Sequence, residues 1–229
     1  MKSNIKEIKI PKDEVLRYLG YKKQELTKEM YALIEETIGE CRNLVTPKHV
    51  YSKYKKNTKD AGVYVEGTSL ILKGEDIKNH LLYANEIFII AATVGNKIEQ
   101  KIRLYQTVNL TKALILDACA TVAIEEFLDE LEEKIKLDAR KENLAITFRY
   151  SPGYGDLPLD IQKDIVNTLK ADKAIGLTVS SHHLLFPRKS VTAIIGLIPK
   201  EKEQKQRGCE LCKNYNNCRF RKEGTNCGA

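Results

Sequence analysis

The sequence contains no apolar run that could cross a membrane. A transmembrane helix needs about 18 or more consecutive apolar residues, and none of the 229 residues lies in such a run. The opening stretch, MKSNIKEIKIPKDE, also lacks the hydrophobic centre of a secretion signal. We therefore expect a cytoplasmic protein with no membrane partner.

A regular alternation of strands with helices is also missing, which argues against a doubly wound parallel sheet. The irregular order instead predicts an α+β domain with a mixed or antiparallel twisted sheet and flanking helices. Period-two patterns predict strands at 49–55, 62–73, 86–94, 145–150, 175–180 and 190–198. Helical spacing predicts helices at 11–21, from an N-cap at Thr27 through Cys41, and at 75–82, 96–106, 111–141 and 159–170.

No long linker divides the chain, and its composition changes clearly only at Lys200. We therefore predict one main domain at 1–199 and a basic, cysteine-rich tail at 200–229. More than half of the formal net charge of +7 falls in this tail, where eight basic residues stand against four acidic ones. Such a tail attracts an acidic partner or simply keeps the protein in solution, and composition leaves both readings open.

The six cysteines fall into two groups. Cys41 and Cys119 lie in apolar helical patterns and are predicted to be buried and unreactive. The other four stand close together, and in a reducing cytoplasm such a cluster favours a metal site over disulfides. Four thiolates suit tetrahedral zinc or an iron–sulfur cluster, and spacing does not separate the two. The predicted ligands are Cys209, Cys212, Cys218 and Cys227.

The segment AITFRYSPGYGDLP, residues 145–158, carries the strongest functional signal. If it begins as a strand, Ile146, Phe148 and Tyr150 share one face and Arg149 points to the other. The Pro-Gly turn that follows exposes backbone groups next to this guanidinium. The segment is therefore predicted to present an arginine at the end of a strand, beside a tight turn.

The turn also supplies an aromatic ring and two glycines. Gly153 and Gly155 let a ligand approach the backbone closely, because glycine has no Cβ. Arg149 suits a carboxylate, and the Tyr154 ring suits a purine or a cation. The set favours a small ligand that carries both a carboxylate and an aromatic base, although many Pro-Gly turns with flanking aromatics are ordinary loops.

The residues RYSPGY at 149–154 resemble the Arg-x-x-x-Gly-Tyr signature of the activation domain of cobalamin-dependent methionine synthase. Three further segments agree in order: EVLRYLGY at 14–21, AATVGNKIE at 91–99, and IGLTVSSHHLLFPRKSVTAIIGL at 175–197. The resemblance covers roughly residues 11–198. It implies the twisted-sheet fold of that domain, in a stand-alone form.

The resemblance also implies a shallow groove that binds S-adenosylmethionine. In the family, the Arg, the third residue, the Gly and the Tyr of the motif line this groove. The matching positions here are Arg149, Ser151, Gly153 and Tyr154.

The family further uses a glutamate on the long preceding helix, which we match to Glu125, with Glu126 as the rival. Some family features have no match. The N-terminal Asp contact and a late Tyr contact have no clear counterpart, and Ala193 stands where the family usually has glycine. The resemblance therefore covers the central motif better than the edges of the groove.

The implied function is the reactivation of a cobalamin-dependent methionine synthase by reductive methylation of cob(II)alamin. Cobalamin would be held by the partner synthase chain, and an electron would come from a flavodoxin-like or other donor. The resemblance implies an accessory subunit that is not active alone, and a sequence that offers no nucleophile motif agrees with such a role. Its task would be to position the methyl donor.

Three other functions stay open. The chain could activate a different corrinoid methyltransferase, which the same motifs would permit. A nucleic-acid-binding protein with a metal-binding basic tail is the second, but the basic residues are not interleaved with a known binding motif. A general S-adenosylmethionine methyltransferase is disfavoured because the usual glycine-rich first strand and loop are missing.

Overall fold

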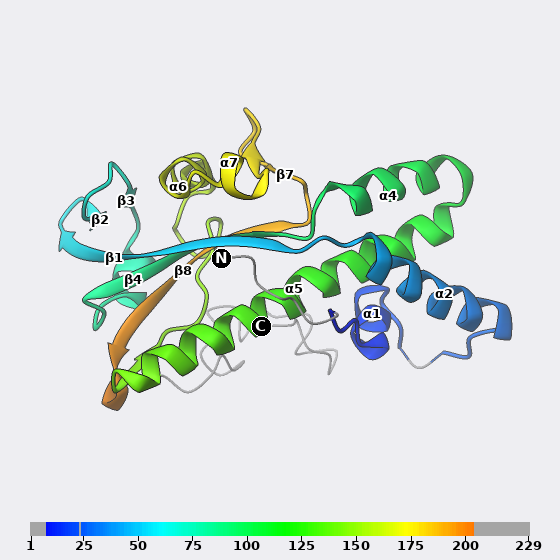
Figure 1. The fold of residues 1–229 in the computed structure, drawn as a ribbon, viewed down its shortest axis with the longest axis horizontal. Helices are drawn as coiled ribbons and strands as arrows, with labels where there is room; N and C mark the ends of the chain where they lie inside the picture. Colours follow the sequence, from blue (N-terminus) through cyan, green and yellow to red (C-terminus); the bar gives the residue numbers. More distant parts are fainter. Residues whose placement is uncertain (1–7, 23, 204–229) are drawn as a thin grey trace.

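The computed structural model describes residues 8–22 and 24–203 (Figure 1). Within them, six strands form one sheet in the order β3-β2-β1-β4-β8-β5, and every paired neighbour is antiparallel. The antiparallel form of the predicted sheet is thus confirmed. The strands are β1 Lys48–Lys59, β2 Gly62–Val65, β3 Ile71–Leu72, β4 Glu86–Thr93, β5 Leu144–Ile146 and β8 Ser190–Pro199, with a separate hairpin of β6 Thr178–Val179 and β7 Leu185–Phe186.

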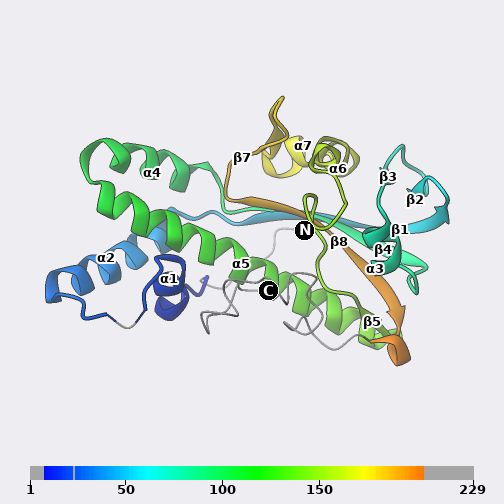
Figure 2. The ribbon, with the colours of Figure 1, turned by 180° about the vertical axis from the view of Figure 1, so that it is seen from behind.

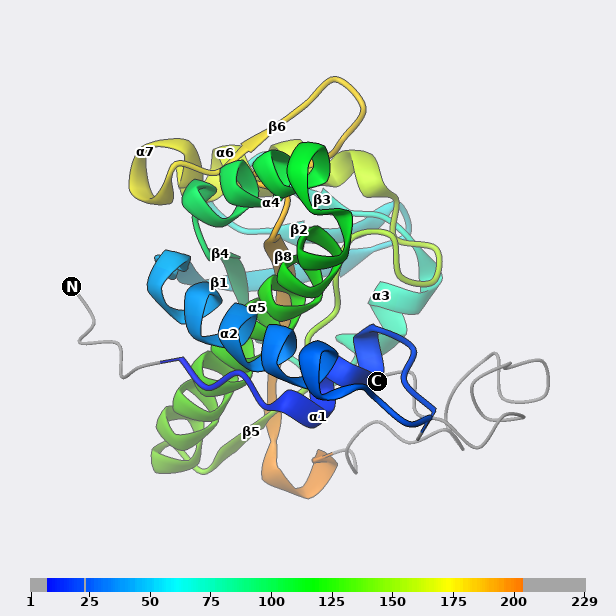
Figure 3. The same ribbon diagram turned by 90° about the vertical axis from the view of Figure 1, so that its right-hand side faces the viewer.

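Helices cover both faces of this sheet. Figures 1 and 3 show α5 with α1 and α2 on one side, and α6 with α7 on the other. Across the described ranges, no helix combines the length and the apolar character that crossing a bilayer requires. The helices are α1 Lys12–Tyr18, α2 Lys28–Leu44, α3 Glu75–His80, α4 Asn96–Val108, α5 Leu110–Lys141, α6 Gln162–Leu169 and α7 Ala171–Ile175, with short 3₁₀ turns at Leu159–Ile161 and Lys200–Lys202.

The sheet separates two buried cores. The α5 core joins α1, α2, α4 and α5 to one sheet face and includes Leu116, Phe127 and Ile90. The α6 core joins α3, α6 and α7 to the other face and includes Ile165 and Ile89. Strand β4 is apolar almost throughout because its alternate side chains enter opposite cores.

Local signals set several helix ends. The Thr27 side chain accepts a hydrogen bond from the Met30 backbone N–H at 3.2 Å, so the predicted N-cap is confirmed. Asn109 caps α5 in the same way through the Lys112 N–H. The predicted burial of Cys41 and Cys119 is also confirmed.

The prediction of a strand at 175–180 was wrong over its first part. Residues up to Ile175 belong to helix α7, and the strand is only Thr178–Val179. Gly176 ends the helix in the left-handed conformation, with φ at 73°. The predicted strand at 62–73 is likewise two short strands, because the chain turns between them at Gly67, where φ is 76°.

Candidate functional site

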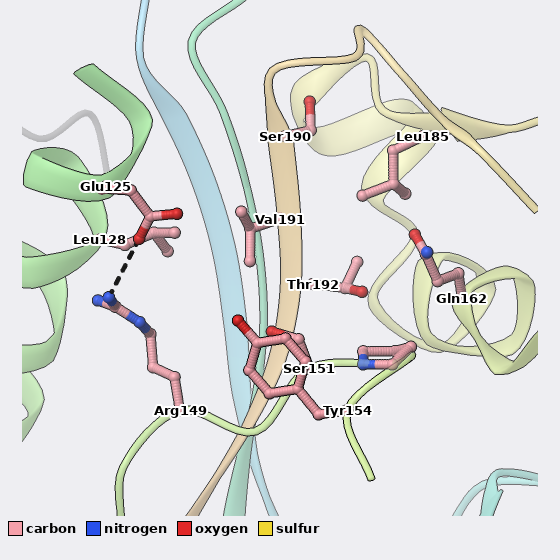
Figure 4. Close-up of a pocket in the computed structure, with 11 residues that line it drawn as sticks. Glu125, Leu128, Arg149, Ser151, Tyr154, Gln162, Leu185, Ser190, Val191 and Thr192 are labelled. Atoms are coloured by element: carbon pink, nitrogen blue, oxygen red, sulfur yellow. Dashed lines mark hydrogen bonds and ion pairs between the residues drawn. The ribbon is translucent and has the colours of Figure 1, made fainter. Parts of the chain in front are cut away.

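A groove of about 190 Å³ opens between helix α5 and the loop that follows strand β5 (Figure 4). Its lining includes four of the five predicted ligand residues, which α5 and the loop bring together across the sequence. Gly153 lies in the same loop but is not part of the lining. The four predicted lining residues are Glu125, Arg149, Ser151 and Tyr154.

Strand β5 is regular only over Leu144–Ile146, so the predicted strand at 145–150 is broken. Ile146 pairs with Leu197, and the next bridge joins Tyr150 to Ile194. The chain therefore advances four residues on one strand and three on the other. This extra residue is a β-bulge, a feature that redirects the side chains next to it.

The bulge changes which side chains share a face. Ile146 packs against the α5 core, whereas Phe148 and Tyr150 belong to the α6 core. The prediction that these three share one face was therefore wrong for Ile146. Arg149 does lie opposite Phe148 and Tyr150, because its guanidinium meets carboxylates of α5.

Arg149 is held by three carboxylates of α5. Its Nη2 lies 2.7 Å from Asp129 Oδ1 and 3.4 Å from Glu125 Oε2, and its Nη1 lies 3.2 Å from Glu132 Oε2. These acids share one helix face because they stand four and then three residues apart. Of the three acids only Glu125 lines the groove, but three carboxylates against one guanidinium leave the cluster at this wall with an excess of negative charge, which suits a ligand with cationic groups.

The loop wall is ordered by hydrogen bonds of its own backbone. The Tyr154 N–H donates to the Ser151 carbonyl at 3.1 Å, and the Gly153 N–H donates to the Leu157 carbonyl at 2.9 Å. Gly153 has φ at 91°, a conformation that favours glycine. The turn thus holds Tyr154, a residue that is 49% exposed, at the groove.

The other loop glycine has a different role from the one predicted. A Cβ at Gly155 would collide with Asp76 of α3 and with the Tyr150 hydroxyl, so protein atoms occupy the space expected for a ligand. Asp156 accepts hydrogen bonds from the Glu75 and Asp76 backbone N–H groups at 2.6 and 3.1 Å. This end of the loop is therefore fixed to helix α3.

Tyr150 supports the loop through its hydroxyl group and its ring. Its hydroxyl donates to the Tyr154 carbonyl at 3.2 Å, and the two rings meet edge to face at 6.0 Å. Burial, with smaller contributions from Asp76 and Asp156, raises the pKa of Tyr150 to about 12. Tyr150 is thus a neutral, buried support rather than a ligand group, a role that the sequence did not indicate.

The two candidate glutamates differ in their access to the groove. Glu125 lines both the groove and a neighbouring hollow, whereas Glu126 lines the hollow, together with Arg17 and Tyr18, and not the groove. Burial raises the pKa of Glu126, and the nearby Asp129 adds to the effect. Their positions favour Glu125 as the ligand residue, and its contact with a ligand stays a prediction.

Sequence reasoning missed the far side of the groove. Gln162 at the start of α6 and Thr192 on β8 both line it, with Leu185 and Val191 adding apolar surface. Thr192 lies within the segment that resembles the family's late block, but nothing in the pattern marked this residue. A period-two or helical pattern predicts which side chains are buried, but it does not show which buried polar side chain borders a groove.

The predicted metal ligands lie outside the described residues. Cys209, Cys212, Cys218 and Cys227 all follow residue 203, where the described range ends. A zinc or iron–sulfur site in the tail therefore stays a prediction, as does the domain boundary near residue 200.

No family model and no curated protein matches the chain. Among solved structures, the crystal structure of the MetH reactivation domain bound to AdoHcy matches with a TM-score of 0.56 and 14% sequence identity. The match covers 89% of this chain and 75% of that one. At this identity the likeness shows a shared fold, an antiparallel sheet with flanking helices, in agreement with the fold that the sequence resemblance implied.

Proposed function

We propose that the chain binds S-adenosylmethionine in the groove and serves as the reactivation subunit of a cobalamin-dependent methionine synthase. One observation carries the proposal: in a fold shared with a domain solved with AdoHcy, four residues assigned from the RYSPGY motif and the long helix line one groove. The cobalamin belongs to the partner synthase chain, and an electron comes from a flavodoxin-like or other donor.

The chemistry of the groove suits this ligand. S-adenosylmethionine carries an ammonium, a sulfonium, a carboxylate and an aromatic base. The carboxylates around Arg149 favour the two cationic groups. The exposed face of Tyr154 offers a surface for the base or the sulfonium.

Arg149 and Glu125 can exchange partners when the ligand binds. Their contact, at 3.4 Å, is the longest of the three that Arg149 makes with α5, and the Glu125 side chain is 46% exposed. An ion pair of this kind contributes under about 1 kcal/mol. The ligand carboxylate replaces Glu125 on the guanidinium, and its ammonium binds the released Glu125. Asp129 and Glu132 keep Arg149 in place during the exchange.

The residues of this chain act by positioning. When bound, S-adenosylmethionine supplies the methyl group, and the reduced cobalt of the partner accepts it. Arg149 and Glu125 fix the amino-acid end of the ligand, and Tyr154 limits its movement. Because the leaving group is a neutral thioether, the chain needs no acid or base at the groove, and orientation is its main contribution.

Calorimetric titration of the full chain with S-adenosylmethionine and S-adenosylhomocysteine tests the first step, and we expect saturable binding of both. The second step adds a cob(II)alamin-loaded synthase that lacks its own activation domain, with a reductant, and follows methylcobalamin by its visible spectrum. Formation of methylcobalamin that depends on the chain supports the proposal. Absence of ligand binding rejects it, and methylation of only a different corrinoid protein assigns the chain to that partner.

We further propose that the tail cysteines hold zinc or an iron–sulfur cluster. Purification of the full chain without air, followed by a visible spectrum and metal analysis, decides between them. A coloured protein with iron and sulfide indicates the cluster, and a colourless one with stoichiometric zinc indicates zinc. Protein with neither metal rejects the site.

A further inference from the structure

Two buried polar atoms in the groove have no hydrogen-bond partner within the described part of the chain. They are Gln162 Oε1 and Thr192 Oγ1. Their residues are only 7% and 2% exposed, and both line the groove. Since buried polar groups in proteins are nearly always hydrogen-bonded, two such atoms in one groove indicate that its contents complete their bonds.

These atoms stand opposite the charged wall. Figure 4 shows Arg149 and Glu125 on one side of the groove and Gln162 with Thr192 on the other. The Tyr154 ring lies between the two sides in this view. One end of the groove is therefore ionic, and the other end offers uncharged hydrogen-bonding groups.

We propose that Gln162 and Thr192 recognise the nucleoside half of S-adenosylmethionine, with Gln162 reading the edge of the adenine base. This inference rests on the proposed function. A glutamine amide carries an acceptor and a donor side by side, and this pair matches the 6-amino group and N7 of adenine. The Thr192 hydroxyl both accepts and donates, so it suits a ring nitrogen or a ribose hydroxyl.

The contacts at the two ends of the groove also set the orientation of the bound ligand. Its zwitterionic amino-acid end lies at Arg149 and Glu125, and its uncharged nucleoside end lies at Gln162 and Thr192. The opposite direction would place the ammonium and carboxylate among uncharged, buried groups, which is costly. The polarity of the groove thus matches the polarity of the ligand.

The test compares S-adenosylhomocysteine with S-inosylhomocysteine, in which the 6-amino group is replaced by a 6-oxo group. Calorimetry on the wild-type chain should show the adenosyl compound binding about tenfold or more tightly, since the amide oxygen would face the 6-oxo group. In Gln162→Met, which keeps the length of the side chain, we expect this preference to disappear. Thr192→Val should weaken the binding of both compounds severalfold.

Thermal unfolding of the ligand-free variants separates binding from structure. Gln162→Met and Thr192→Val should melt at or above the wild-type temperature, because neither atom loses a partner within the described chain. The matched control is Thr37→Val. Thr37 is fully buried in α2 and donates to the Leu33 carbonyl at 2.7 Å. This control should melt lower and bind both ligands as the wild type does.

The two proposals fail in different ways. If the wild type binds S-adenosylhomocysteine but shows no preference over the inosyl compound, or if Gln162→Met keeps the preference, the inference is wrong and the proposed function stands. If Thr192→Val melts as low as Thr37→Val, Thr192 is a structural residue. If neither S-adenosyl compound binds the wild type, the proposed function itself falls.

Discussion

Helix α5 and the loop after strand β5 form two walls of the same groove, and they hold their side chains by different means. On the helix wall, Glu125, Asp129 and Glu132 project from one face of a regular helix into partly exposed positions. On the loop wall, the backbone is fixed by its own hydrogen bonds and by helix α3. Figure 2 shows β5 beside the end of α5, and the chain passes from Lys141 of the helix to Leu144 of the strand within three residues.

This difference implies different responses to substitution. A substitution in the charged cluster of the helix wall, which includes its loop partner Arg149, removes an ion pair whose remaining members are partly exposed to water, so it should alter ligand binding and spare the fold. A substitution in the packed part of the loop, at Tyr150 or Gly155, disturbs atoms that are already in contact, so it should lower stability first. Four substitutions test this division, taken from the largest expected effect to the smallest.

Gly155→Ala should destabilise the protein by about 3 kcal/mol, from a left-handed conformation and a collision with Asp76 and Tyr150. Urea unfolding measures this loss. Gly67→Ala is the control, because Gly67 also has positive φ but has no atom within 4 Å of the added Cβ. The control should lose only about 1 kcal/mol. Equal losses would mean that the contact between the loop and α3 contributes little.

Arg149→Ala should weaken S-adenosylmethionine binding by about 10- to 100-fold, the usual effect of losing a charged hydrogen bond. The melting temperature should change little, because the carboxylates left behind, Asp129, Glu125 and Glu132, are 63%, 46% and 27% exposed and can be solvated by water. Calorimetry and thermal unfolding give the two values. Arg140→Ala, an exposed change in the last turn of α5, controls for the loss of one positive charge. Unchanged affinity in the Arg149 variant would refute its role.

Substitutions of the two candidate glutamates should have different effects on ligand affinity. Glu125→Gln removes the carboxylate that lines the groove and should reduce affinity for S-adenosylmethionine about fivefold, the effect of one partly exposed ion pair. Glu126→Gln alters the neighbouring hollow and should leave the affinity near that of the wild type. Calorimetry on both variants measures the difference. The reverse order would assign the ligand contact to Glu126.

Tyr150→Phe should cost about 1 kcal/mol at pH 8, through the lost hydrogen bond to the Tyr154 carbonyl. The fold raises the pKa of Tyr150 to about 12, so the wild type keeps its full stability below pH 10. Between pH 10 and 12 the unfolded chain loses this proton first, and wild-type stability falls. The phenylalanine variant lacks this loss, so the difference in urea unfolding should narrow with rising pH. A difference in the free energy of unfolding that stays constant with pH would contradict the raised pKa of Tyr150.

The sequence by itself determined the fold class and the helix wall. Helical spacing predicted α5 over nearly its whole length, and the residue pattern at 86–94 predicted strand β4. The irregular order of strands and helices predicted a sheet that is not wholly parallel. The Thr27 cap and the burial of Cys41 and Cys119 also follow from local pattern. These features depend on neighbours within a few residues, which is the range that periodicity and capping rules describe.

Only the tertiary structure decided how the groove is built. The bulge between Ile146 and Tyr150 is defined by pairing with β8, and it places Ile146 on the opposite face from Phe148 and Tyr150, which strand alternation did not foresee. Gly155 packs against Asp76, about eighty residues earlier, and Gln162 shares the groove with Thr192 of another element. Contacts of this kind depend on how elements that are distant in the sequence pack together. A single sequence indicates which residues are buried and which periodicity an element has, but it does not indicate which distant residue each side chain contacts.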